Sequence, residues 1–485
     1  MKYRGLFFVV CAVLMMALCG VLLTTKYFII APAIPVALLG FLLLYRYPEH
    51  GVILLAFLVP LEGLFAGNKL FTGSKFVGVA LIAIILVKLL SKEISFRQLK
   101  TPLWWPILLL VFAFSISSAW SPYPDLSMNS LRQLVTAISI FFITLGLKDR
   151  INIIYFMKAV VISVAITAFL ALVSGSHSLE DRAIGLLTDP NYFALLLTTA
   201  IPLAFYLILN DRHIVLKLLW CALLVVILIA FQKTLSRSGV VVLVIAFGFL
   251  GYHYKENLKK LTGAQVGLIF IGGMLMTIIS FLAMPEDYRD RILSLANITS
   301  GVQSFEDRSL GRRTSYIVVG LNAFKDNPIV GSGPGTFPVH YAKSGYATAF
   351  SLNSNEPELF RRAHNTYLET LTETGLTGFL ALCGIIITGL LQFKNARKKS
   401  IANGDYGQAT LITHTGVAFL AISLFFMFLT GINNKYFWMF LALSSWFIQQ
   451  ASDSSPLNAE CKSTLDVEPK VPSKATPVLR GSEEK

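Results

Sequence analysis

The chain has 485 residues, of which 55% are hydrophobic and 14% charged, and its mean hydropathy is +0.67. A soluble domain of this length cannot bury so much apolar surface, so the composition excludes one and predicts an all-α polytopic membrane protein. The formal net charge of +14 does not indicate a nucleic-acid partner, because basic loops also set membrane topology and no nucleic-acid-binding module is recognisable.

Apolar runs that could cross a bilayer follow one another along most of the chain. The first run follows Met1–Arg4 and is interpreted as an uncleaved helix, because further spans come directly after it. Some runs are shorter than the roughly 20 residues that a perpendicular span needs, so we expect about 12–14 transmembrane helices. The runs occupy residues 6–24, 28–45, 51–66, 76–91, 102–120, 130–147, 154–174, 191–209, 214–232, 238–254, 264–284, 366–392, 407–430 and 436–449.

Basic residues in alternate connecting loops predict the orientation of these spans. With the N-terminus in the cytoplasm, loops such as those holding Lys92 and Lys259 follow the positive-inside rule to the end of the chain. Both termini are then cytoplasmic, and the loops at 175–190, 233–237 and 285–365 face the opposite side.

The chain divides by composition into three parts. We expect N-terminal transmembrane helices at 1–175 and a transmembrane core at 176–450, which includes the long outer loop 285–365 with its short helices. Residues 451–485 are rich in Ser, Pro, Glu and Lys, which is typical of a disordered tail, here on the cytoplasmic side.

The long outer loop holds two features with a local structural signal. Apolar and polar residues alternate at helical spacing from Arg312 to Asn327, which predicts an amphipathic helix that ends at Asp326-Asn327-Pro328. The run Gly331 to Gly335 could approach a phosphate, but it lacks the lysine and the strand–helix context of a nucleotide loop. A tight turn is the preferred interpretation.

Arginines recur on the predicted outer loops, against the topological bias. They are Arg182, Arg237, Arg312 and Arg313. A guanidinium suits phosphate oxygens because it presents paired donors in a planar fork. The alternative for any one of them is a solvated loop arginine.

His364 lies just before an apolar run, after Arg361 and Arg362. Thr366 and Glu369 have the spacing of a capping box, so a helix is expected to start there, with His364 at its mouth. Imidazole titrates near neutrality, which makes His364 a candidate general base. A histidine with only a structural role in capping the helix is the alternative.

The outer loops lack the sequence motifs of metal and nucleotide chemistry. There is no acidic Asp-x-Asp pair, no His-Glu-x-x-His, no Gly-x-Ser-x-Gly and no Walker loop, and the five cysteines lack metal-site spacing. We therefore expect neither a metal nor a cofactor. Arginines would have to neutralise any phosphate.

Several short motifs occur in order between residues 182 and 378. They are Arg182-Ala183-Ile184-Gly185 leading to Asp189-Pro190-Asn191; Ser236-Arg237-Ser238-Gly239; Gly311-Arg312 with Tyr316; Asn327 to Gly335; and His364-Asn365-Thr366-Tyr367-Leu368 with Glu373, Gly375 and Gly378. Each is weak alone, but the ordered set is specific. Together they resemble the O-antigen ligase and O-antigen polymerase superfamily of bacterial inner-membrane glycosyltransferases.

The resemblance implies transfer of a glycan from undecaprenyl pyrophosphate to a hydroxyl on the periplasmic face of the inner membrane. The acceptor is lipid A-core in ligases, the growing glycan in polymerases, and a protein hydroxyl in related protein glycosylases. By similarity, Arg237 and Arg312 bind the pyrophosphate, with Arg313 as the alternative to Arg312, and His364 deprotonates the acceptor. Arg182 joins the pyrophosphate-binding set, and the supporting residues would be Asn191, Asn365, Tyr367 and Glu373.

Two questions stay open from the sequence. Ligase and polymerase share the same donor chemistry, and we favour the ligase reading by a small margin. A transporter of polyprenyl-linked glycans is the alternative from another class. It should show internal symmetry and ionisable residues at mid-membrane depth, but no repeat is visible and Glu62, Lys158 and Glu373 are the few candidates.

Overall fold

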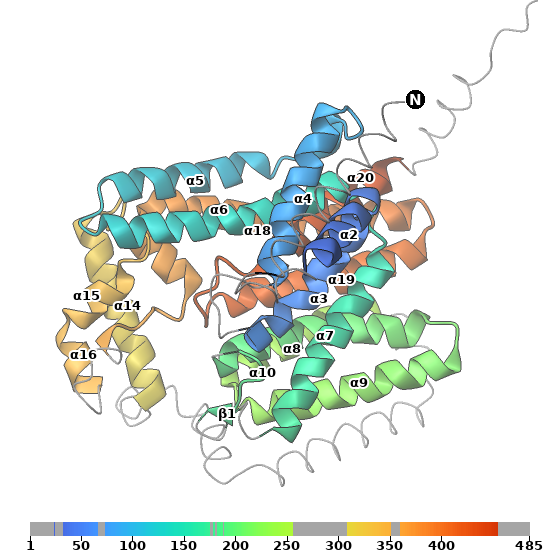
Figure 1. Ribbon diagram of the computed structural model, residues 1–485. Coiled ribbons are helices and arrows are strands. Elements are labelled where there is room, and N and C mark those ends of the chain that lie inside the picture. Colours follow the sequence, from blue (N-terminus) through green and yellow to red (C-terminus); the bar gives the residue numbers. More distant parts are fainter. Residues whose placement is uncertain are drawn as a thin grey trace, which may run out of the picture.

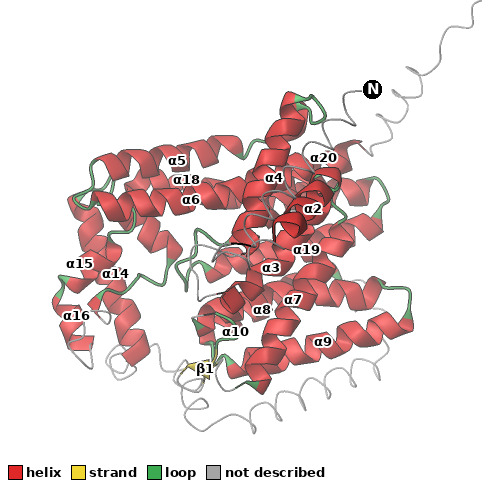
Figure 2. Cartoon of the chain, in the orientation of Figure 1, coloured by secondary structure: helices red, strands yellow, loops and turns green. Residues whose placement is uncertain are grey.

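The computed structural model describes residue 24 and residues 33–65, 73–174, 178–179, 182–187, 189–255, 308–350 and 359–453. These residues are almost entirely helical, with one two-stranded hairpin, so the all-α fold class is confirmed (Figure 2). In chain order the elements are α2 (Ala33–Arg46), α3 (Pro48–Leu58), η2 (Val59–Phe65), α4 (Gly73–Leu90), η3 (Phe96–Leu99), α5 (Trp104–Ala119), α6 (Pro124–Leu147), α7 (Ile153–Val173), β1 (Ser178–Leu179), β2 (Arg182–Ala183), α8 (Pro190–Asn210), α9 (Ile214–Lys233), α10 (Arg237–His253), α14 (Arg308–Asp326), α15 (Phe337–Ala342), α16 (Gly345–Phe350), α18 (Thr366–Ala402), α19 (Tyr406–Phe425) and α20 (Lys435–Asp453).

Seven helices of the described residues are long and apolar enough to cross a bilayer, namely α4, α6, α7, α8, α9, α18 and α19. The segments Leu38–Arg46 and Pro48–Leu64 together pass the same test but are bent by 116°, so they form a broken span or a re-entrant loop. The apolar helices α5 and α10 are shorter. The predicted spans at 6–24 and 264–284, and the tail at 451–485 apart from its first three residues, lie outside the described residues.

Large apolar side chains cover the outer surface of several helices. On α9, Val215 is 72% exposed and Leu218 is 63% exposed, and Val244 on α10 is 65% exposed. A soluble protein rarely exposes so many large apolar groups together, whereas lipid chains solvate them at little cost. The protein is therefore a multi-pass membrane protein. Which end of the bundle faces the periplasm stays a prediction.

The core of the bundle is formed around α8, α18 and α20. Helix α18 packs against α5, α19 and α20, and α8 packs against α9 and α19 (Figure 1). Helix α20 is buried on nearly every side, with the aromatic rings of Phe437 and Phe419 stacked at 5.4 Å. This packing fixes the loop between α19 and α20, which reaches the site described below.

Helices α14, α15 and α16 form a separate group at one end of the bundle, beside the ends of α5 and α6 (Figure 1). The predicted amphipathic helix is confirmed as α14, which starts four residues earlier than expected. Tyr316 and Val319 are buried as its pattern predicts, whereas Leu321 is 41% exposed. The group forms a small apolar cluster with Leu368 of α18, so the long loop is anchored on the helix that follows His364.

Helix α18 is broken at Gly375, and the glycine run of the long loop packs into the break. Gly375 has φ 68° and ψ −167°, a conformation open to glycine almost alone. The N–H of Leu376 donates to Pro328 O at 2.9 Å, and the N–H groups of Ser332 and Gly333 donate to carbonyls of α18 at 3.1 and 2.9 Å. Because these N–H groups are occupied by the helix, the run acts as a turn and not as a phosphate loop.

Candidate functional site

Two of the sequence motifs meet at the starts of α8 and α10. The Asp189 carboxylate accepts hydrogen bonds from the N–H groups of Asn191 and Tyr192, at 2.7 and 2.9 Å, and so caps α8. Ser236 caps α10 by accepting from Gly239 N at 3.2 Å, and its hydroxyl donates to Asn191 Oδ1 at 2.8 Å. Asn191 therefore joins the two helix starts.

Arg182 and Arg237 are brought to the same turn by this arrangement. The β1–β2 hairpin places Arg182 beside the α9–α10 turn, where its Nε donates to Thr234 O at 2.9 Å. Leu235, which follows Thr234 in this turn, has a positive φ of 52°, and Arg237 is the first residue of α10. Both arginines are half-buried. The fold thus brings to one turn two arginines that lie far apart in the sequence.

Arg312 and Arg313, adjacent on α14, are directed to different partners. The guanidinium of Arg312 donates to Phe350 O of α16 at 2.8 Å. The guanidinium of Arg313 lies over the Phe428 ring, 5.8 Å from its centroid, near the end of α19. Arg313 also acts electrostatically on His364. Arg313 therefore belongs to the surroundings of His364, whereas Arg312 is bound to α16.

His364 is half-buried in a left-handed backbone conformation, with φ 47°. Its ring lies 6.0 Å from that of Tyr316 on α14. Burial lowers the pKa of His364 below its ordinary value, and Arg313 and Arg361 lower it further, while Asp189 and Glu369 act in the opposite direction. The imidazole is therefore neutral at pH 7, which is the form that can accept a proton. Asp189, Tyr316 and His364 come from three of the sequence motifs, which therefore meet at this residue.

The capping box expected at Thr366 and Glu369 was wrong in its detail. The helix starts at Thr366 as predicted, but Asn365 is the N-cap and accepts from Leu368 N at 3.0 Å. The hydroxyl of Thr366 instead donates to Leu429 O at 2.6 Å. Thr366 contacts the α19–α20 loop because that loop packs on the helix start, a tertiary contact that local spacing cannot reveal.

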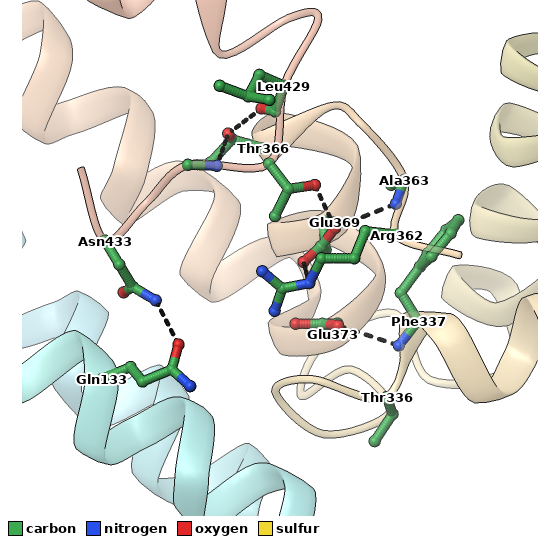
Figure 3. Close-up of polar contacts among 12 residues, drawn as sticks. Gln133, Thr336, Phe337, Arg362, Ala363, Thr366, Glu369, Glu373, Leu429 and Asn433 are labelled. Atoms are coloured by element: carbon green, nitrogen blue, oxygen red, sulfur yellow. Dashed lines mark hydrogen bonds and ion pairs between the residues drawn. The ribbon is translucent and has the colours of Figure 1, made fainter. Parts of the chain in front are cut away.

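Glu369 holds together the segment that carries His364. Its Oε2 accepts from Ala363 N at 3.2 Å and from the Thr430 hydroxyl at 2.6 Å, and its Oε1 lies 3.6 Å from Arg362 Nε (Figure 3). One carboxylate thus fixes residues 362 and 363 to α18 and to the α19–α20 loop. His364 follows directly.

Glu373 and Tyr367, two of the predicted supporting residues, make structural contacts. Glu373 is 5% exposed, and its Oε1 accepts from Phe337 N at 3.0 Å, at the start of α15 (Figure 3). The Tyr367 hydroxyl donates to Ser423 O of α19 at 2.8 Å. These bonds tie α18 to the long loop and to α19, respectively.

A cavity of about 250 Å³ lies on the segment that carries His364. Its walls come from α5, α6, α8, α18 and the α19–α20 loop. Arg362 and Thr366, which flank His364 by two residues on either side, both line it. The complete lining is Phe114, Ser130, Gln133, Tyr192, Arg362, Thr366, Glu369, Thr370, Glu373, Thr430, Gly431, Ile432, Asn433 and Asn434.

The other outer-loop histidines are placed differently. His340 of α15 lines a second cavity of about 270 Å³ with Trp120, and no arginine lines that cavity. Burial lowers the pKa of His340, and Lys343 lowers it further. His177 lies outside the described residues. Of the outer-loop histidines that the structure describes, His364 is the one that has arginine neighbours, Arg313 and Arg361.

Sequence reasoning missed several residues around this site. Arg361 and Arg362 form a basic pair beside His364 in the sequence, and this position was the signal that could have added them to the predicted site residues. Gln133 and Asn433 carried no such signal, because 300 residues separate them and tertiary packing alone brings them together. In the described part of the chain, no group of three or more His, Cys, Asp or Glu side chains is arranged to hold a metal ion.

The fold and this site define a polytopic membrane protein with a cluster of arginines around a neutral histidine. Residues 222–383 match the family model described as O-antigen ligase, which supports the resemblance to the O-antigen ligase superfamily. The match includes Arg237, the α14 arginines, His364 and Glu373, whereas Arg182 and Asn191 precede it.

The chain is also similar to an uncharacterized protein of Haemophilus influenzae, with 29% identity over 209 residues. The alignment covers 40% of this chain and 49% of that protein. The chain thus matches about half the length of this relative.

Proposed function

We propose that this protein transfers a glycan from undecaprenyl pyrophosphate to an acceptor hydroxyl on the periplasmic face of a bacterial inner membrane. The observation that carries the proposal is the convergence of Asp189, Arg313 and Arg361 on a half-buried His364. The superfamily match over residues 222–383 supports the same chemistry. A ligase that acts on lipid A-core is favoured, and a polymerase of the superfamily is the alternative within this class.

The arginines supply the charge that the leaving group needs. As the bond between the anomeric carbon and the phosphate oxygen breaks, negative charge accumulates on the pyrophosphate. In this proposal, Arg182 and Arg237 at the α9–α10 turn and Arg312 and Arg313 on α14 supply the guanidinium groups. Preorganised cations at developing charge contribute strongly in partly buried sites. No metal is required in this scheme.

His364 acts on the acceptor. Its neutral imidazole takes the hydroxyl proton as the acceptor oxygen attacks the anomeric carbon, and the bonding electrons leave with undecaprenyl pyrophosphate. General base catalysis of this kind contributes roughly 10²–10⁴-fold. A single displacement inverts the anomeric configuration.

Lysine substitution at the arginines tests the donor site. Lysine keeps the charge but lacks the paired donors of the guanidinium fork. We expect Arg237→Lys and Arg312→Lys to lose most transfer from a purified undecaprenyl-pyrophosphate-linked oligosaccharide, assayed in EDTA. Arg212→Lys, on the exposed loop between α8 and α9, is the matched control and should retain full activity.

Two outcomes would change the assignment. Normal transfer by Arg312→Lys with loss in Arg313→Lys would move the role by one residue. Normal transfer by Arg237→Lys and by both α14 variants would refute the donor site, and activity that needs added magnesium would refute charge neutralisation by arginine alone.

A further inference from the structure

Glu62 belongs to the short helix η2, which continues the bent pair of helices α2 and α3. Gly63, the next residue, approaches Leu186 so closely that a Cβ at this glycine would overlap Leu186 O. Leu186 lies between β2 and Asp189, the N-cap of α8 and an electrostatic neighbour of His364. Helix η2 therefore packs beside the site, although it precedes the region that matches the family model.

An ion pair joins η2 to the start of α20. The Lys435 ammonium pairs with the Glu62 carboxylate, and the Ser74 hydroxyl at the start of α4 donates to the same carboxylate oxygen. Lys435 Nζ also donates to Ser74 Oγ at 3.1 Å. The side chains of Lys435 and Glu62 are 23% and 31% exposed, so water reaches both only in part. Removal of one partner from such a pair leaves the other charge uncompensated, which costs more than the loss of a solvated surface pair.

The α19–α20 loop, which ends at this ion pair, is bonded to the start of α18. Gly431 N donates to the Thr366 hydroxyl at 3.0 Å. The Thr430 hydroxyl donates at 2.6 Å to Glu369, the carboxylate that also fixes the residue before His364 (Figure 3). A movement of the loop would therefore be passed to the segment that carries His364.

The end of the loop is fixed on its other side as well. Asn434 Nδ2 donates to the Tyr192 hydroxyl of α8 at 3.2 Å, and Asn434 Oδ1 accepts from Phe437 N at 2.9 Å. Asn434 and Tyr192 both line the cavity of about 250 Å³. Asn434 and Lys435 thus set the distance between the loop wall of this cavity and the helices on its opposite side.

We propose that Glu62 is a positioning residue of the transferase, whose ion pair with Lys435 holds the α19–α20 loop, and through it the segment carrying His364, in the arrangement that transfer requires. The inference rests on the proposed function and deepens it, because it gives the N-terminal helices a part in the site. Glu62 is not among the residues that line the cavity, so it acts through the loop and not on the substrate. The pairing also accounts for this acidic residue without a transport pathway.

Hydrogen exchange tests the structural half of the inference without any substrate. Lys435→Met keeps most of the side-chain length and removes the charge. The amides at 429–434 should then exchange at least about tenfold faster than in the unmodified protein, which corresponds to about 1.4 kcal/mol. The amides at 361–366 should follow by a smaller factor. Unchanged exchange in either segment would overturn the inference.

Transfer and donor binding, measured on one preparation of the full-length protein, separate positioning from a general loss of folded protein. Transfer is expressed per donor-binding molecule, so unfolded protein does not contribute. Glu62→Gln and Lys435→Met should each lower this rate at least about tenfold and leave the affinity for the undecaprenyl-pyrophosphate-linked donor within about twofold, because the arginines are left in place. A normal rate per binding molecule would show that the pair serves stability alone, and would overturn the inference.

Exchange of the two charges supplies a rescue. In the double variant Glu62→Lys with Lys435→Glu, the Ser74 hydroxyl can serve the reversed pair because it both donates and accepts, and a carboxylate is favoured in the first turn of α20. The double variant should recover most of the protection and transfer that either single reversal loses. Glu93→Gln, which removes the acid of the Lys88–Glu93 ion pair at the other end of α4, is the matched control and should change neither. A double variant as impaired as the single reversals, or an equal loss in the control, would overturn the inference.

The two proposals fail separately. If the arginine variants transferred glycan normally while Lys435→Met loosened both segments and slowed transfer, the donor chemistry would be wrong and the role of the ion pair would stand. If the arginines proved essential but Lys435→Met left exchange unchanged, the ion pair would lose its role and the transferase would stand.

Discussion

Removing the carboxylate of Glu369 should loosen the segment that carries His364. In Glu369→Ala, the N–H of Ala363, a residue only 2% exposed, and the hydroxyl of Thr430 lose their acceptor. A buried polar group without a partner costs about 1–3 kcal/mol, so two such groups cost about 2–6 kcal/mol at most. Thr430 lines the cavity, where water can replace its partner, so we expect the lower end, about 2–3 kcal/mol.

Amide hydrogen exchange measures this directly. A loss of about 2–3 kcal/mol should speed exchange of the amides at 361–366 roughly 30- to 150-fold. Glu369→Gln keeps one acceptor oxygen and should give a smaller increase. Glu93→Ala, which removes a largely exposed carboxylate far along the chain, serves as the control and should leave these amides unchanged. Exchange in Glu369→Ala that matched the unmodified protein would refute the role given to this carboxylate.

Three further predictions follow from the same geometry. Because burial and the arginines lower the pKa of His364, transfer should be constant at neutral pH and fall only below about pH 6.5 as the imidazole gains a proton. Arg361→Gln removes a cation that opposes protonation, so the fall in activity on the acid side should move to higher pH. A fall that stayed at the same pH or moved to lower pH would contradict this. Gly375→Ala forces a side chain into a glycine-only conformation, where its Cβ would overlap Ile329 O, and should lower the free energy of unfolding by about 3 kcal/mol or more. Gly384→Ala, in the regular part of α18, should change it by less than about 1 kcal/mol. Similar melting temperatures for the two variants would refute the break in the helix. A single cysteine at Thr348 in a cysteine-free background should react with a membrane-impermeant maleimide in cells with a permeabilised outer membrane, and labelling only after inner-membrane lysis would reverse the predicted topology.

The helices were largely predictable because each apolar run must satisfy its own backbone hydrogen bonds in lipid. The start of α18 followed from the local signal before Thr366, and the run 191–209 predicted α8 to within one residue at each end. The 116° bend between α2 and α3 was not predicted, because the run 28–45 and the run 51–66 look like independent short spans in the sequence.

The site was predictable in its residues more than in its geometry. The arginines and His364 were identified from their positions on outer loops, but the cap at Asn365 and the contacts of Glu369 depend on the α19–α20 loop. That loop approaches because α20 is buried in the bundle core. The cavity could be found only from the fold, since two of its lining residues, Gln133 and Asn433, come from segments without any shared local pattern.

The most direct test of the central claim is donor binding and glycan transfer measured on the same purified His364→Ala protein. We expect transfer to be lost while binding of the undecaprenyl-pyrophosphate-linked donor stays close to that of the unmodified protein, because the arginines hold the pyrophosphate. Arg312→Ala, measured in parallel, should lose both. If His364→Ala transferred glycan at a normal rate, or lost donor binding as fully as Arg312→Ala, His364 would not be the base that acts on the acceptor.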